Sequence, residues 1–234
     1  MQPENPLMAQ GQTASGTLAL AQNRVLRNTY ALLAISLLPT IGGAWTGLAM
    51  NLHQMVAGHA GMFALVFLVG AYGLMFAIQA NRNSSLGVAL LLGFTFFMGV
   101  MLAPLLSVIL GMANGVKLIA LAIGGTAVVF GSMASLATVV KRDLSGLGKF
   151  LFVGAIVLLV AMVANIFLQL PALMIALSVI AIAIFSAFML YDVNRIVTGG
   201  ETNYVTATLN LYLDIYNVFT NLLALLGITG GSSD

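Results

Sequence analysis

Two aspartates interrupt stretches of sequence that are otherwise almost uncharged, Asp192 in the sixth long apolar run and Asp214 in the seventh. An ionisable side chain inside a membrane is costly, so such residues usually serve a function. Two carboxylates that meet in a low-dielectric environment share a proton unless a cation or an arginine compensates their charge. Carboxylate oxygens are also preferred ligands of Ca²⁺, and protonation would release the ion. Asp192 and Asp214 are therefore the candidate pH-sensing, ion-gating and Ca²⁺-binding residues.

Further polar residues accompany Asp214 at helical spacing. Intervals of four, four, three and four residues separate the members of this set, which are Thr206, Asn210, Asp214, Asn217 and Asn221. This spacing places them on one face of a helix, which predicts that the face lines the bundle interior or a water-filled path. A hydrogen-bonded contact between helices is the alternative. Asn210, Asn217 and Asn221 are candidate pathway-lining residues, and Asn165 is another, although a buried amide most often caps or bridges a neighbour.

Asp192 also has a simpler interpretation. Arg195 follows three residues later, so the two side chains could form an ion pair at the end of a helix. A tight turn at Gly199 and Gly200 would leave Asp192 and Asp214 offset by about 9 Å, at 1.5 Å per helical residue. A loop over residues 201–203, or a late start of the last helix, would bring the two carboxyl groups together.

The composition shows which elements must position these residues. The 234 residues include only eight Lys or Arg and six Asp or Glu, and 61% of them are apolar. This much apolar surface cannot be hidden in a soluble domain, which excludes a soluble enzyme, a nucleic-acid binder and a disordered protein. The chain has no cysteine, so disulfides and Cys-ligated metals are also excluded.

The long uncharged intervals predict seven membrane-spanning helices. Single spans are expected at about 29–50, 60–80, 86–109, 118–140 and 204–228, and two more lie between 150 and 191 with a turn at 169–171. The predicted fold is an all-α polytopic membrane protein, a seven-transmembrane-helix bundle. We expect residues 1–23 to be a disordered polar tail and 24–230 to be the membrane domain. Glycines at 93, 99, 124 and 131 predict close packing of helices.

The basic residues predict the orientation of the chain. With a cytoplasmic N-terminus, seven of the eight lie on the inner side and only Lys117 lies outside. The first apolar run is too long for the core of a signal peptide and has no convincing cleavage site, so we expect it to remain as an anchor. His53 and His59 then fall in an external loop, where we expect solvated side chains.

Three segments identify a resemblance to a known family. Residues 141–145 (KRDLS), 190–196 (LYDVNRI) and 211–219 (LYLDIYNVF) resemble signatures of the Bax inhibitor-1 (TMBIM) family, and the similarity extends from about residue 24 to residue 228. Residues 25–30, 163–167 and 199–204 are similar to its bacterial YccA-like branch in particular. The resemblance implies a seven-helix protein in which Asp192 and Asp214 form a pH-sensitive latch over a Ca²⁺ leak pathway.

The resemblance has further implications for mechanism, partners and location. In the bacterial Ca²⁺-leak members an arginine at the end of the second helix pairs with the first aspartate in the closed state, and Arg82 is the candidate here. YccA-like members are also implied to bind and modulate the membrane protease FtsH through a cytoplasmic N-terminal tail. We expect a bacterial inner-membrane location, no catalytic activity and no cofactor other than Ca²⁺ as the transported or bound ion. Paired membrane aspartates can also perform proteolysis, but the glycine-flanked context of such proteases is missing.

Overall fold

The computed structural model describes residues 6–140, 142 and 144–230, and it is entirely helical over these residues, as the sequence predicted. The helices are α1 (Pro6–Ala49), α2 (Leu52–Ala80), α3 (Ser85–Leu110), α4 (Gly115–Val139), α5 (Ser145–Leu168), α6 (Pro171–Val197) and α7 (Tyr204–Gly230). Each contains a stretch long and apolar enough to cross a membrane. The chain is therefore a multi-pass integral membrane protein with seven spans.

The predicted turns separate the helices at the expected places. Gln169 adopts a left-handed conformation with φ of 51° at the end of α5, and Pro171 then opens α6. A proline is well tolerated at that position because the first helical N–H has no partner within the helix. At the start of α2 residues 52–54 are helical rather than part of a loop, and a break at His59 separates this short piece from the span. His59 is exposed, whereas His53 is half-buried.

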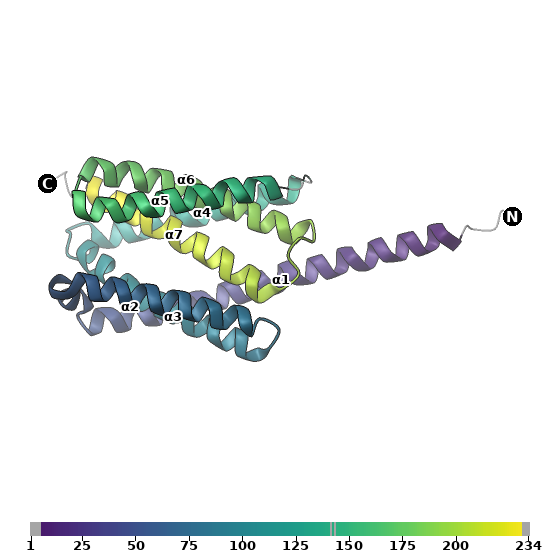
Figure 1. Cartoon of the computed structure of the whole chain (residues 1–234), viewed down its shortest axis with the longest axis horizontal. Coiled ribbons are helices and arrows are strands. Elements are labelled where there is room, and N and C mark those ends of the chain that lie inside the picture. Colours follow the sequence, from purple (N-terminus) through teal and green to yellow (C-terminus); the bar gives the residue numbers. More distant parts are fainter. Residues whose placement is uncertain (1–5, 141, 143, 231–234) are drawn as a thin grey trace.

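The first helix differs most from the expectation. It begins at Pro6 and runs without interruption to Ala49, so residues that we expected to be a disordered tail form a helix. Gln, Ala and Leu in this segment have good helix propensity, and no proline follows before the membrane span begins. Residues 1–5 lie outside the described part of the chain. Figure 1 shows the N-terminal part of α1 projecting well beyond the bundle.

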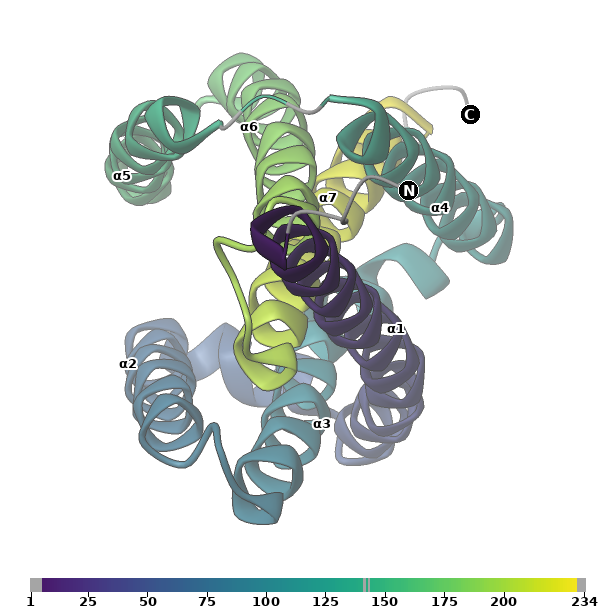
Figure 2. The same ribbon diagram turned by 90° about the vertical axis from the view of Figure 1, so that its right-hand side faces the viewer.

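Helix α7 occupies the centre of the bundle. It packs against α1, α2, α3, α4 and α6, whereas α5 packs on α6 alone. In Figure 2 the other helices are arranged around α7, and α5 lies at the periphery. The central position explains why α7 carries the longest run of buried residues, since five neighbours cover its surface. It also places the polar face of α7 against protein.

The basic residues are distributed between the two ends of the bundle as the sequence predicted. The start of α1, the α2–α3 turn and the α6–α7 loop lie at one end of the bundle, and α7 ends at the other (Figure 1). That first end carries Arg82 in the α2–α3 turn and Arg195 in the last turn of α6. Arg24 and Arg27 follow Gln22 on α1, whose side chain lies beside Gly199 of the α6–α7 loop. Lys117 lies on the first turn of α4, just after the α3–α4 turn. The assignment of the basic end to the cytoplasm stays a prediction.

Close helix packing depends on fewer glycines than we expected. At Gly99 of α3 an added Cβ would collide with the Thr40 carbonyl oxygen of α1, and Gly43 of α1 meets the Phe96 carbonyl oxygen in the same way. The α1 and α3 backbones therefore approach as closely as small residues allow. The expectation was wrong for Gly93, Gly124 and Gly131, because a Cβ at each of these would meet nothing within 4 Å.

Candidate functional site

The structure brings Asp192 and Asp214 together. Helix α6 continues for five residues past Asp192, and α7 starts late, at Tyr204. The loop between them folds back, with the Glu201 amide donating a hydrogen bond of 3.0 Å to the Arg195 carbonyl oxygen. The two carboxyl groups lie within hydrogen-bonding range of each other. Asp192 is 8% exposed and Asp214 is 5% exposed, so both members of the pair are buried.

The pair is not symmetric in its surroundings. Asp214 Oδ2 is buried and has no hydrogen-bond donor as a partner. Asp192 Oδ1 lies 4.0 Å from Nη1 of Arg195, so a positive charge compensates Asp192 directly. Both interpretations of Asp192 from the sequence are therefore present in one site, since this residue pairs with Asp214 and with Arg195. A buried carboxylate without a donor is costly, and a proton held between the two carboxyl groups would satisfy it.

Arg195 is held by several groups at once. Its Nη2 lies 3.6 Å from Oε2 of Glu201 and donates to the Gly200 carbonyl oxygen at 3.4 Å. Its guanidinium carbon also lies 5.6 Å from the centre of the Tyr191 ring. An arginine fixed in this way is a positioned charge rather than a mobile surface side chain. Sequence reasoning considered Arg195 only as a partner of Asp192 and missed its contact with Glu201 across the Gly-Gly turn.

Arg82 does not take the place that the family resemblance implied. It lies in the α2–α3 turn with an exposed side chain. The ion pairs found among the described residues join Arg195 to Asp192 and to Glu201, and neither includes Arg82. In this structure Arg195 is therefore the partner of Asp192. A role for Arg82 in ion gating stays a prediction.

Asn203 connects two loops and starts α7, and sequence reasoning missed it. Its Oδ1 accepts hydrogen bonds of 3.0 Å from the Val205 and Thr206 amides, which makes it the N-cap of α7. Its Nδ2 donates to the Arg82 carbonyl oxygen at 3.0 Å and to Asn83 Oδ1 at 2.8 Å. An asparagine just before a helical stretch is a recognised N-cap signal. The cross-loop bonds have no such signal.

The polar face of α7 is satisfied mainly by local hydrogen bonds. Asn217 Nδ2 donates to the Leu213 carbonyl oxygen and Asn221 Nδ2 donates to the Asn217 carbonyl oxygen, both at 2.8 Å. Thr206 Oγ1 reaches Gln79 Oε1 of α2 at 3.2 Å. The side chain of Asn210 is half-buried. Besides the contact of Asp214 with Asp192 on α6, the stripe thus contains one interhelical bond and two bonds within the helix. A pathway-lining role for its asparagines stays a prediction.

Asn165 lies apart from this site. It is on α5, and its Oδ1 accepts a 3.2 Å hydrogen bond from the Leu170 amide at the end of that helix. The structure therefore gives Asn165 the capping role that we considered as its alternative. A pathway through α5 has no support from the packing, because α5 contacts α6 alone.

The aspartate pair stays a candidate for binding Ca²⁺ through its carboxylate oxygens. Ca²⁺ normally takes six to eight oxygen ligands. No group of three His, Cys, Asp or Glu side chains that could hold a metal is found in the described ranges. The carboxyl groups of Asp192 and Asp214 could contribute oxygens to a cation in transit, and we treat Ca²⁺ as a candidate substrate.

The fold and the site define a seven-helix membrane protein with a buried pair of aspartates at the α6–α7 hairpin. The family model described as "Inhibitor of apoptosis-promoting Bax1" matches residues 22–231, so the chain belongs to the Bax inhibitor-1 family.

Relatives from several bacteria are similar to this chain over almost their whole length. The "Modulator of FtsH protease YccA" of Escherichia coli K12 is 41% identical over 90% of this chain and 93% of its own. The same values hold for the "Inner membrane protein YccA" of E. coli O6:H1. An uncharacterised protein of Pseudomonas aeruginosa is 39% identical over 91% of this chain and 95% of its own.

Proposed function

We propose that this protein is a pH-sensitive leak channel or transporter for Ca²⁺ in the bacterial inner membrane, gated by Asp192 and Asp214. The observation that carries the proposal is the buried contact between these two carboxyl groups on neighbouring helices. Packing alone does not require two acidic side chains in a membrane bundle, since an apolar pair would avoid the cost of burying them.

The gate operates through the charge of the pair. While the two carboxyl groups share one proton they attract each other, and the α6–α7 contact stays closed. Loss of that proton leaves two adjacent negative charges, of which Arg195 directly compensates the one on Asp192. The second charge then favours separation of the helices or the arrival of a cation. A divalent ion with a preference for oxygen ligands fits this need.

Calcium flux in proteoliposomes tests this function. The parent protein, Asp192→Asn and Asp214→Asn would be reconstituted at equal density and assayed at several pH values with a Ca²⁺-sensitive dye. We expect both variants to lose the pH-dependent part of the flux, because an amide cannot release the shared proton. Lys117→Gln is the matched control, since it removes an exposed charge from the first turn of α4, where Leu118 packs beside Gly230 at the opposite end of α7 from the α6–α7 loop. Flux equal to the parent at every pH in both aspartate variants would refute the gate.

A second function, modulation of a membrane protease, is favoured by a separate observation. Helix α1 projects beyond the bundle at its basic end (Figure 1), and a relative that is 41% identical is named a modulator of the FtsH protease. A projecting helix on the cytoplasmic side is a suitable contact for a partner in the same membrane. This chain would then bind an FtsH-type protease through residues 6–19 and regulate its action.

Co-purification distinguishes the second function from the first. Removal of residues 1–19 leaves the span that starts at Leu20 intact. We expect the truncated protein to lose association with the protease while it retains the ion flux of the full chain. Undiminished association would refute the role of the projecting segment, and loss of both properties would show that the truncation disturbs the bundle.

A further inference from the structure

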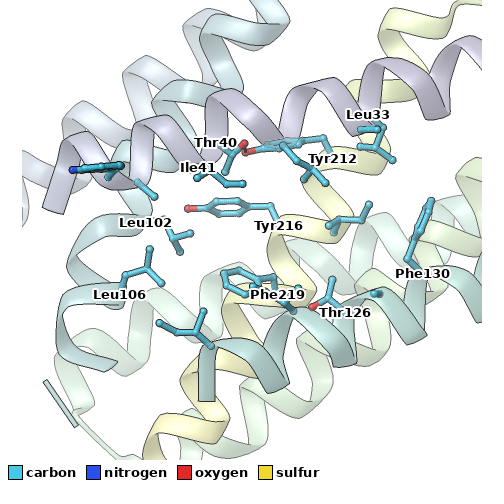
Figure 3. Close-up of a pocket in the computed structure, with 18 of the residues that line it drawn as sticks. Leu33, Thr40, Ile41, Leu102, Leu106, Thr126, Phe130, Tyr212, Tyr216 and Phe219 are labelled. Carbon is cyan, nitrogen blue, oxygen red and sulfur yellow. Dashed lines mark hydrogen bonds between the residues drawn. The ribbon is translucent and has the colours of Figure 1, made fainter. Parts of the chain in front are cut away.

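A large apolar cavity lies between α1, α3, α4 and α7, on a side of α7 that the aspartate pair does not use. Its volume is about 900 Å³. Figure 3 shows the cavity with Tyr216 and Phe219 of α7 facing Leu102 and Leu106 of α3, and Thr40 of α1 close to Tyr212. Pockets of about 300–1,000 Å³ are the usual size for a bound small molecule.

The cavity opens sideways, between α1 and α4. No Cα atom of α1 lies within 8 Å of one in α4 over the described ranges, so the two helices leave a gap on this side. Trp45 and Ile41 of α1 and Ile123 of α4 line the cavity, and they are 75%, 64% and 56% exposed. Tyr30 and Phe130 close one end, where their rings meet edge to face at 5.9 Å.

The opening lies at the depth of lipid tails. Lining residues on α1 run from Tyr30 to Ala49. Nineteen residues of helix rise about 28 Å, close to the roughly 30 Å thickness of the hydrocarbon core. The mouth is therefore continuous with the lipid-facing surface of the bundle. The mouth of the cavity therefore faces the bilayer interior rather than water.

The lining is apolar apart from a few hydroxyl groups and the Trp45 indole N–H. None of the lining residues carries a charge. The hydroxyl groups of Thr40, Thr126 and Tyr216 donate to the carbonyl oxygens of Ser36, Ala122 and Met98 at 3.0, 2.7 and 3.3 Å. Tyr212 donates to the Thr95 carbonyl oxygen at 3.4 Å, and it also bonds Thr40. A charged ligand would find no opposite charge in this lining, so burying it here would be costly.

A helix from another protein is about 10 Å across with its side chains, and the ring contact between Tyr30 and Phe130 would block its path at one end of the cavity. An acyl chain is thinner and flexible, and it gains dispersion contacts with the apolar wall that an empty cavity would lack. We propose that this cavity is a binding site for a phospholipid acyl chain, which enters from the bilayer between α1 and α4. Neither Asp192 nor Asp214 lines this cavity.

Photo-crosslinking with a phospholipid that carries a diazirine at the end of one acyl chain tests the proposal. The full-length protein would be reconstituted with this lipid, irradiated and mapped by mass spectrometry. We expect adducts on Tyr216 and Phe219, which line the inner wall on the central helix. Adducts confined to outward-facing residues such as Val128, which is 69% exposed, would overturn the proposal.

A pair of variants on α4 checks the route of entry. Ala127 lines the cavity and its neighbour Val128 does not. We expect Ala127→Trp to reduce the adducts on α7 several-fold and Val128→Trp to leave them at the parent level. Equal labelling of α7 in both variants would refute entry at this mouth. Labelling by a diazirine fatty acid but not by the phospholipid would refute a phospholipid as the occupant.

Discussion

Asn203 provides the sharpest test of how the α6–α7 hairpin is held. Replacement by alanine removes the N-cap bonds to the Val205 and Thr206 amides and both bonds to the α2–α3 turn. Loss of an asparagine N-cap costs about 1 kcal/mol. Two further hydrogen bonds in a partly exposed place contribute about 0.5 kcal/mol each, at the low end of the usual range. Asn203→Ala is therefore expected to destabilise the start of α7 by about 2 kcal/mol.

Hydrogen exchange measures this local cost directly. A change of one to two kcal/mol alters an opening equilibrium by about 5- to 30-fold. We expect the Val205 and Thr206 amides to exchange faster by a factor in that range in Asn203→Ala, while amides in the middle of α7 stay protected. Asn203→Asp is the matched control, because its carboxylate keeps the cap and its charge suits a helix N-terminus. It loses only the two bonds that Nδ2 donates.

The expected order of exchange at these two amides is parent, then Asn203→Asp, then Asn203→Ala. Unchanged exchange of Val205 and Thr206 in the alanine variant would refute the cap. Equal acceleration in both variants would show that the bonds to the α2–α3 turn, rather than the cap, hold this end of the helix.

Three further predictions follow from the packing and the ion pairs. Gly99→Ala is expected to lower the free energy of unfolding of the detergent-solubilised protein by about 1–3 kcal/mol in a thermal melt, because the added Cβ collides with α1. Gly93→Ala is the control, since its Cβ meets nothing within 4 Å, and it is expected to keep or slightly raise that free energy. Arg195→Gln should alter the pH dependence of Ca²⁺ flux more than Arg82→Gln, because Arg195 is the arginine beside Asp192. A larger effect of Arg82→Gln would show that Arg82 is the partner of Asp192 during gating. Asn165→Ala should lower the free energy of unfolding by about 1 kcal/mol in the same melt, because its hydrogen bond is a local cap. Ion flux should not change, and a clear loss of flux would show that Asn165 lines the pathway.

The sequence by itself determined the membrane class, the seven spans and the two residues at the centre of the site. Apolar length and the scarcity of charge are local properties that each segment carries alone, so the span boundaries agree with the helices to within a few residues for α3, α4 and α7. The resemblance to the Bax inhibitor-1 family also came from local motifs, and the family comparison confirmed it. The N-terminal segment was misjudged because its polar composition suggested disorder, although its Gln, Ala and Leu residues favour a helix.

Only the tertiary structure decided which partners meet. Asp192 and Asp214 are 22 positions apart, and whether they touch depends on where α6 ends and how the loop folds back. The choice of Arg195 over Arg82, the close contact at Gly99 and the open surroundings of Gly93 all depend on how neighbouring helices are placed. The lateral cavity arises because the backbones of α1 and α4 stay apart, and the sequence of neither helix shows how far it lies from the other. Helix formation is local, whereas helix packing is a property of the whole bundle.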